Sequence, residues 1–128
     1  MGSLDMNGPW ELTTENIDAK VTRKEPGNYA LSRRIISGKQ HVDYVGRSDD
    51  DLSGRLHDYI GGKYTHFWAA YASSSKAAFD KECQNWHDFH GPEGELDNDI
   101  HPRRPDGQSW KCPVDGCEYS DKPKKSVW

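Results

Sequence analysis

Two short runs of strand-forming residues on either side of a turn constrain the fold more than any other feature of the sequence. Tyr29, Leu31 and Ile35–Ile36 favour one strand, and the HVDYVG run at 41–46 favours a second. The SGKQ link at 37–40 is so short that the two strands are expected to pair as an antiparallel hairpin. The chain is therefore expected to build on an antiparallel sheet.

Helix signals surround this hairpin. Thr13 or Thr14 offers an N-cap for a short helix, and the SDDDL segment at 48–52 offers an N-cap and negative charge for another. An aromatic-rich third strand over 64–72 is followed by serine caps and helix formers over 73–90. We therefore expect an α/β (α+β) fold, with a small three-stranded, mostly antiparallel sheet flanked by helices in the order β-β-α-β-α.

The C-terminal segment 91–128 holds five of the seven prolines and shows no periodicity, which is typical of a loop-rich extension. The predicted organisation is an N-terminal tail and short helix over 1–25, a main domain over 26–90, and this extension packed on the same domain. Only 33% of the residues are hydrophobic, so the core is small and a structural metal would help to hold the extension.

Composition excludes several classes of protein. No apolar run approaches the roughly 18 residues of a membrane helix, and no signal-peptide pattern opens the chain, so a cytoplasmic protein without a membrane partner is expected. The net charge of −4 means that nucleic-acid binding would need a local basic patch. The oligomeric state is left open.

The cysteines and histidines predict a structural zinc site. Three cysteines are an odd count that argues against a disulfide framework. Cys83 and His87 are four apart and share a helix face, while Cys112 and Cys117 form a Cys-x4-Cys knuckle. His101 competes with His87 for the fourth ligand position. Zinc would then staple the loop-rich extension to the last helix.

Two tyrosine-containing triplets resemble a known nuclease pattern. GNY at 27–29 and YVG at 44–46 stand in order before Arg55 and Glu82. Over 26–87 this arrangement resembles the GIY-YIG nuclease domain, and the chain as a whole is similar to small uncharacterised proteins that join such a domain to a zinc-binding C-terminus. The resemblance implies hydrolysis of phosphodiester bonds in DNA.

The resemblance also assigns roles to individual residues. Glu82 would hold a catalytic Mg²⁺ or Mn²⁺, and Tyr29 would act near the attacking water as a candidate general base. Tyr44 would support Tyr29. Arg55 would clamp the phosphate, a task for which the guanidinium fork is well suited.

Three further residues are expected at the same site. Tyr59 lies about 40° from Arg55 around a helix, so the two side chains would share a face. Gly46 would let the substrate approach, and it also suits a turn between strand and helix. Arg47 would add a second phosphate contact.

The last helix is expected to serve both proposed sites. Glu82 points about 100° or more away from the edge that carries Cys83 and His87. One side of the helix would therefore face a catalytic cleft, and another side would face the zinc-stapled extension.

An alternative function stays open at this stage. Asn28 stands where the family has an isoleucine, and the net charge is acidic. Both features favour a catalytically inactive nucleic-acid- or protein-binding module on the same fold.

Overall fold

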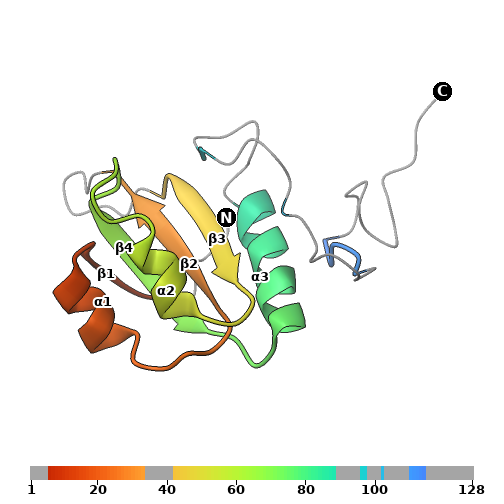
Figure 1. Ribbon diagram of the computed structural model, residues 1–128. Helices are drawn as coiled ribbons and strands as arrows, with labels where there is room; N and C mark the ends of the chain where they lie inside the picture. The colour runs from red at the N-terminus through yellow and green to blue at the C-terminus, as the bar shows by residue number, and fades with distance from the viewer. Residues whose placement is uncertain (1–5, 34–41, 89–95, 98–101, 103–109, 115–128) are drawn as a thin grey trace.

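The chain forms an antiparallel sheet with helices on both faces (Figure 1). The computed structural model describes residues 6–33, 42–88, 96–97, 102 and 110–114. The elements in chain order are β1 (Asn7–Glu11), α1 (Thr14–Lys20), β2 (Gly27–Ser32), β3 (Tyr44–Ser48), α2 (Leu52–His57), β4 (His66–Tyr71) and α3 (Ser75–Asp88). The fold is α+β, and the four strands lie in the order β1-β4-β2-β3.

The predicted hairpin is present as β2 and β3. These strands pair antiparallel, with Tyr29 opposite Gly46 and Leu31 opposite Tyr44. The predicted turn at 37–40, with Ile35 and Ile36 before it, lies outside the described residues. The antiparallel pairing is confirmed, and it brings the two triplets side by side.

The sheet has a strand that the sequence did not predict. Residues 1–25 were expected to be a tail and a short helix, yet β1 lies there and pairs antiparallel with β4. The prediction of three strands was wrong because this strand is short and carries Gly8 and Pro9, which weaken a strand signal. Tertiary contact stabilises it instead, since the Trp10 and Phe67 ring centroids lie 5.4 Å apart.

The predicted helix caps are confirmed. Thr13 caps α1, because its Oγ1 accepts a hydrogen bond from the Asn16 N–H at 3.1 Å. Asp51 caps α2, because its Oδ1 accepts a hydrogen bond from the Gly54 N–H at 3.0 Å. None of the described helices has the length and apolar character that crossing a membrane requires.

The two faces of the sheet bury different clusters. Alternate β2 residues point to opposite faces, so Tyr29 and Leu31 pack with α1 and α2 while Ala30 packs with α3. The first cluster includes Ile17, Leu52, Leu56, Phe67 and Ala69, and the second includes Val42, Val45, Trp68, Trp86 and Leu96. In Figure 1, α3 accordingly lies on the opposite side of the sheet from α2, beside the end strand β3.

Candidate functional site

Four tyrosines meet on the sheet face that α2 covers. The Tyr29 and Tyr59 hydroxyls are 2.8 Å apart and share a hydrogen bond. The Tyr44 ring stacks on Tyr29 with centroids 6.3 Å apart and lies 5.8 Å from Tyr59. Tyr64 adds a fourth ring, with its centroid 6.0 Å from both Tyr44 and Tyr59. Three predicted site residues are therefore in contact, together with one that was not predicted.

Gly46 makes room for this cluster. A Cβ at position 46 would lie 2.4 Å from Cζ and from the hydroxyl oxygen of Tyr29, which is too close for any real contact. Gly46 lies inside β3 rather than in a turn. The space beside it is filled by the ring of Tyr29, which is fully buried. The glycine is needed so that the Tyr29 ring can cross the neighbouring strand.

Burial decides the protonation state of the central tyrosines. Burial, followed by the charge and hydrogen bond of Tyr59, raises the pKa of Tyr29 far above its ordinary value. Burial and Tyr59 likewise raise the pKa of Tyr44. Both hydroxyls are therefore protonated at neutral pH, whereas a general base works best when its pKa lies near the operating pH.

Arg55 affects the pKa of three predicted catalytic residues. It is an exposed residue on α2, and its positive charge works to lower the pKa of Tyr29, of Tyr44 and of Glu82. The Glu82 carboxylate in turn helps to raise the pKa of Tyr44. The tyrosines and Glu82 lie on opposite faces of the sheet.

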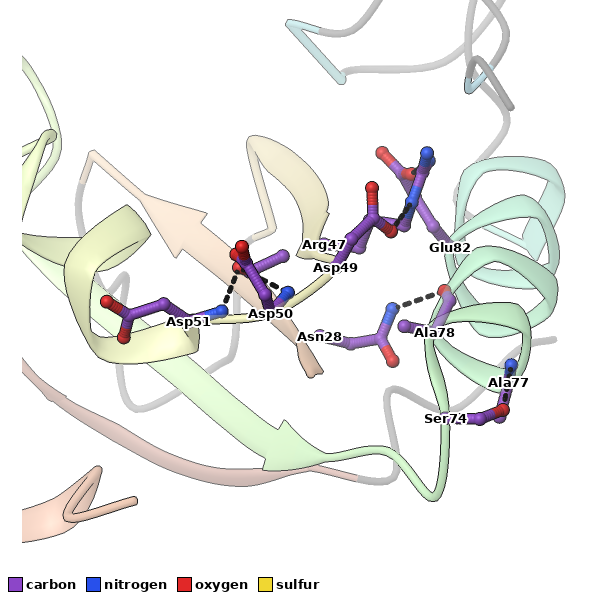
Figure 2. A network of polar contacts seen from close by, with 10 residues as sticks. Asn28, Arg47, Asp49, Asp50, Asp51, Ser74, Ala77, Ala78 and Glu82 are labelled. Carbon is purple, nitrogen blue, oxygen red and sulfur yellow. Dashed lines mark hydrogen bonds and ion pairs between the residues drawn. The ribbon is translucent and has the colours of Figure 1, made fainter. Parts of the chain in front are cut away.

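Glu82 forms an ion pair with Arg47 (Figure 2). The Arg47 Nη1 and Glu82 Oε1 atoms are 2.5 Å apart, and each side chain is only 11% exposed. Arg47 Nε also donates to Asp49 Oδ1 at 2.9 Å, and its guanidinium carbon lies 5.2 Å from the centroid of the Phe79 ring. Arg47 therefore pairs with Glu82, the carboxylate that the resemblance assigns to a metal ion.

The Glu82 carboxylate has the donor chemistry that a divalent ion needs. Mg²⁺ and Mn²⁺ prefer carboxylate oxygens, but Glu82 Oε1 is already paired with Arg47. Burial raises the pKa of Glu82 above its ordinary value, and the Arg47 charge works against that rise. The carboxylate is therefore both desolvated and already neutralised by a guanidinium.

Asn28, which stands where the GIY-YIG family has an isoleucine, has a clear structural role. Its Nδ2 donates to the Ala78 carbonyl at 2.9 Å, and the residue is buried between β2 and α3 (Figure 2). The amide thus fixes α3, and with it Glu82, against the strand that carries Tyr29.

The described zinc candidates lie close together. The Cys83 and Cys112 side chains are buried with Phe79, and Cys112 Sγ lies 3.6 Å from His87 Nε2. Burial, followed by Cys112, raises the pKa of the Cys83 thiol. In the part of the chain that the structure describes, no group of three or more histidine, cysteine, aspartate or glutamate side chains is arranged to hold a metal. His101 and Cys117 lie outside that part.

Tyr64 was missed because its neighbours come from distant segments. Its hydroxyl donates to Asp97 Oδ2 at 2.8 Å, and Asp97 also pairs with Arg33 at 3.3 Å and Lys63 at 3.4 Å. No local spacing connects position 64 with position 97. An aromatic residue at the start of a predicted strand was the only available signal.

Comparisons of the chain with protein-family models, with curated proteins and with solved structures find no match. The function must therefore be inferred from the site itself.

Proposed function

We propose that this protein hydrolyses phosphodiester bonds in DNA at the site around β3. The observation that carries the proposal is the contact among Tyr29, Tyr44 and Tyr59 at the β2–β3 pair, with Arg55 exposed on α2. A guanidinium, hydroxyl donors and a carboxylate are the kinds of group that bind a phosphodiester and an attacking water. The resemblance to the GIY-YIG domain points to the same residues.

The side chains have distinct roles in this proposal. Arg55 binds the phosphoryl oxygens and stabilises the charge that develops on them. Tyr29 stays protonated and buried, so it does not serve as a base, and it acts on the site through its hydrogen bond to Tyr59. Tyr59 holds the Tyr29 hydroxyl, and Tyr44 packs against its ring.

Glu82 would hold the Mg²⁺ or Mn²⁺ ion, which supplies charge neutralisation at the phosphate when bound. Asn28 positions Glu82 indirectly through its hydrogen bond to Ala78.

A nicking assay on DNA substrates of different structure tests the proposal. With Mg²⁺ or Mn²⁺, Glu82→Gln and Arg55→Ala should each lower the cleavage rate on the order of 100-fold or more, because each removes a group that stabilises transition-state charge. Lys76→Ala on the exposed surface of α3 is the matched control and should cleave as the wild type does. Equal cleavage by the wild type and Glu82→Gln, with both folded by circular dichroism, would refute a catalytic role.

A second candidate function is metal-independent nucleic-acid binding without turnover. The Arg47–Glu82 ion pair favours it, since a neutralised carboxylate does not require a metal. Fluorescence anisotropy with labelled DNA in the presence of a chelator separates the two functions. Saturable binding that is unchanged by Mg²⁺, without cleavage, would support this candidate over hydrolysis.

We also propose a structural zinc ion held by Cys83, Cys112, Cys117 and either His87 or His101. The contact between Cys112 and His87 and the burial of Cys83 with Cys112 support this ligand set. Cysteine and histidine are the ligands of closed structural zinc sites, and such sites stabilise segments that lack a core of their own.

Metal analysis of the purified protein tests the zinc site. About one zinc per chain is expected, and Cys112→Ser should lower both the zinc content and the melting temperature. His66→Ala, on β4, is the control and should keep its zinc. Comparing His87→Ala with His101→Ala identifies the fourth ligand. A metal-free wild-type protein of unchanged stability would refute the site.

A further inference from the structure

The tyrosine cluster has a buried centre and a partly exposed rim. Tyr29 is fully buried, whereas Tyr44, Tyr59 and Tyr64 are each only partly buried. The Tyr29 hydroxyl shares its hydrogen bond with Tyr59. A substrate at this surface would therefore meet the rim, and Tyr29 would act on it only through Tyr59.

The ring of Tyr59 is held by contacts with other segments. Tyr59 lies just past the end of α2, in a turn that continues into Gly61, whose φ is +86°. A side chain in such a turn has several staggered rotamers open to it. The contacts that select one are the Tyr29 hydroxyl and the rings of Tyr44 and Tyr64.

Tyr64 is oriented in turn by Asp97. Tyr64 lies just before β4, and its hydroxyl donates a hydrogen bond to Asp97 Oδ2 at 2.8 Å. Burial, followed by Asp97, raises the pKa of Tyr64, so the hydroxyl stays protonated and donates at neutral pH. A hydrogen bond to a carboxylate is stronger than one between neutral groups, so this contact is well suited to fix a ring.

Asp97 is itself fixed from several sides. Its N–H donates to the Asp43 carbonyl at 2.5 Å, and its carboxylate pairs with Arg33 at 3.3 Å and with Lys63 at 3.4 Å. The preceding residue, Leu96, is buried in the cluster on the α3 face of the sheet. The segment after α3 thus contributes an acceptor whose position is well defined.

We propose that the Asp97 carboxylate is a positioning group for the proposed site and orients Tyr59 through Tyr64. The inference rests on the proposed function, because it takes the tyrosine cluster as part of the substrate site. Tyr64 and Asp97 are both positioning residues. The segment after α3 then belongs to the site, although it lies beyond the region 26–87 that resembles the GIY-YIG domain.

NMR of protein with ¹³C-labelled tyrosine rings tests the orientation without any turnover. Tyr64→Phe keeps the ring and removes only the hydroxyl that contacts Asp97. Tyr64→Phe and Asp97→Ala should each shift the Tyr59 ring signals by more than a linewidth. Combining the two changes should add little further shift, because both break the same link.

Tyr71→Phe is the matched control. It removes a hydroxyl that accepts a hydrogen bond from the Arg23 N–H at 2.8 Å, and Tyr71 lies at the other end of β4 from Tyr64. The Tyr59 signals should stay in place in this variant.

The DNA cleavage assay connects the orientation to the reaction. Tyr64→Phe and Asp97→Ala should each lower kcat about tenfold with KM nearly unchanged, because a misplaced ring slows the chemical step while Arg55 still binds the phosphate. Asp97→Asn keeps an acceptor oxygen and should restore part of the rate that Asp97→Ala loses. Tyr71→Phe should cleave as the wild type does.

Unchanged Tyr59 signals in folded Tyr64→Phe, or additive shifts in the double variant, would overturn the proposal. Shifted signals with the kcat of the wild type would overturn the positioning role. If the wild type cleaves no DNA, the proposed function fails, whereas the NMR comparison still decides whether Asp97 orients Tyr59.

Discussion

Gly46 illustrates how a single atom can decide the geometry of the site. The Tyr29 ring crosses β3 at this glycine, and a methyl group there would overlap the ring. The Tyr29 hydroxyl reaches Tyr59 only because that space is open. The glycine of the YVG triplet and the tyrosine of the GNY triplet thus form one structural unit.

Gly46→Ala is expected to destabilise the fold by about 2 kcal/mol, because the fully buried Tyr29 ring has no room to move. Urea unfolding measures the change in the free energy of unfolding. Gly62→Ala is the matched control, since its Cβ would meet only the Tyr59 carbonyl at 3.4 Å. The control should stay within about 0.5 kcal/mol of the wild type. Equal stability of both variants would contradict the role assigned to Gly46.

The buried tyrosines also predict how stability depends on pH. Because burial raises the pKa of Tyr29, the folded protein keeps a proton that the unfolded chain loses near the ordinary tyrosine pKa of about 10. The stabilisation is complete below that pH and falls as the pH rises above it. The slope is at most about 1.4 kcal/mol per pH unit for each such tyrosine.

Urea midpoints measured from about pH 9 to about pH 11 test this dependence. Tyr29→Phe should show a shallower decline than the wild type, because one titrating group is gone. A free energy of unfolding that does not change over this range would contradict the assigned burial of Tyr29.

At the scale of elements, the site depends on how α3 is fixed to the sheet. Asn28 connects β2 to the first turns of α3 through the Ala78 carbonyl, and the Arg47–Glu82 pair connects β3 to the same helix. Both contacts lie on the sheet face opposite the tyrosines. The position of Glu82 relative to Tyr44 is therefore set by helix packing rather than by the strands alone.

Asn28→Ala is expected to lower the free energy of unfolding by about 1–2 kcal/mol, because a buried hydrogen bond is lost. Gln84→Ala is the control. It removes an exposed side-chain hydrogen bond to Asp88 on the same helix, and it should change stability by less than about 0.5 kcal/mol. Thermal denaturation of the two variants measures their stability. A similar loss of stability in both would argue against a special role for the Asn28 amide.

At the scale of the whole molecule, the chain returns to the sheet after α3. Leu96 is buried in the cluster of Trp68 and Trp86, and the Asp97 N–H donates to the Asp43 carbonyl at 2.5 Å. Asp97 also accepts the Tyr64 hydroxyl hydrogen bond. Residues 96–97 are thereby anchored to the sheet and to the tyrosine cluster.

Leu96→Ala is expected to cost about 2 kcal/mol, because it removes apolar contacts from a packed cluster. Ile60→Ala is the control, since Ile60 is the large apolar residue that is exposed among those described. Urea unfolding should show little change for Ile60→Ala. If Leu96→Ala were equally mild, the extension would not be anchored at this point.

The local features of this protein follow from its sequence. The antiparallel pairing of β2 and β3 joins strands that follow one another along the chain, and the caps at Thr13 and Asp51 depend on side chains three residues from the amides they cap. Such interactions involve neighbours along the chain, so residue type and spacing are sufficient to predict them.

Only the tertiary structure decided the rest. Strand β1 joins the sheet by pairing with β4. Tyr64 donates a hydrogen bond to Asp97, and Glu82 pairs with Arg47, which lies 35 positions earlier in the chain. These contacts depend on strand order and helix packing, which no local spacing encodes. The sequence by itself determined which side chains are available for the proposed phosphate site. The packing of α3 beside β3 decided that the Glu82 carboxylate is held by Arg47, because that packing buries both charges together.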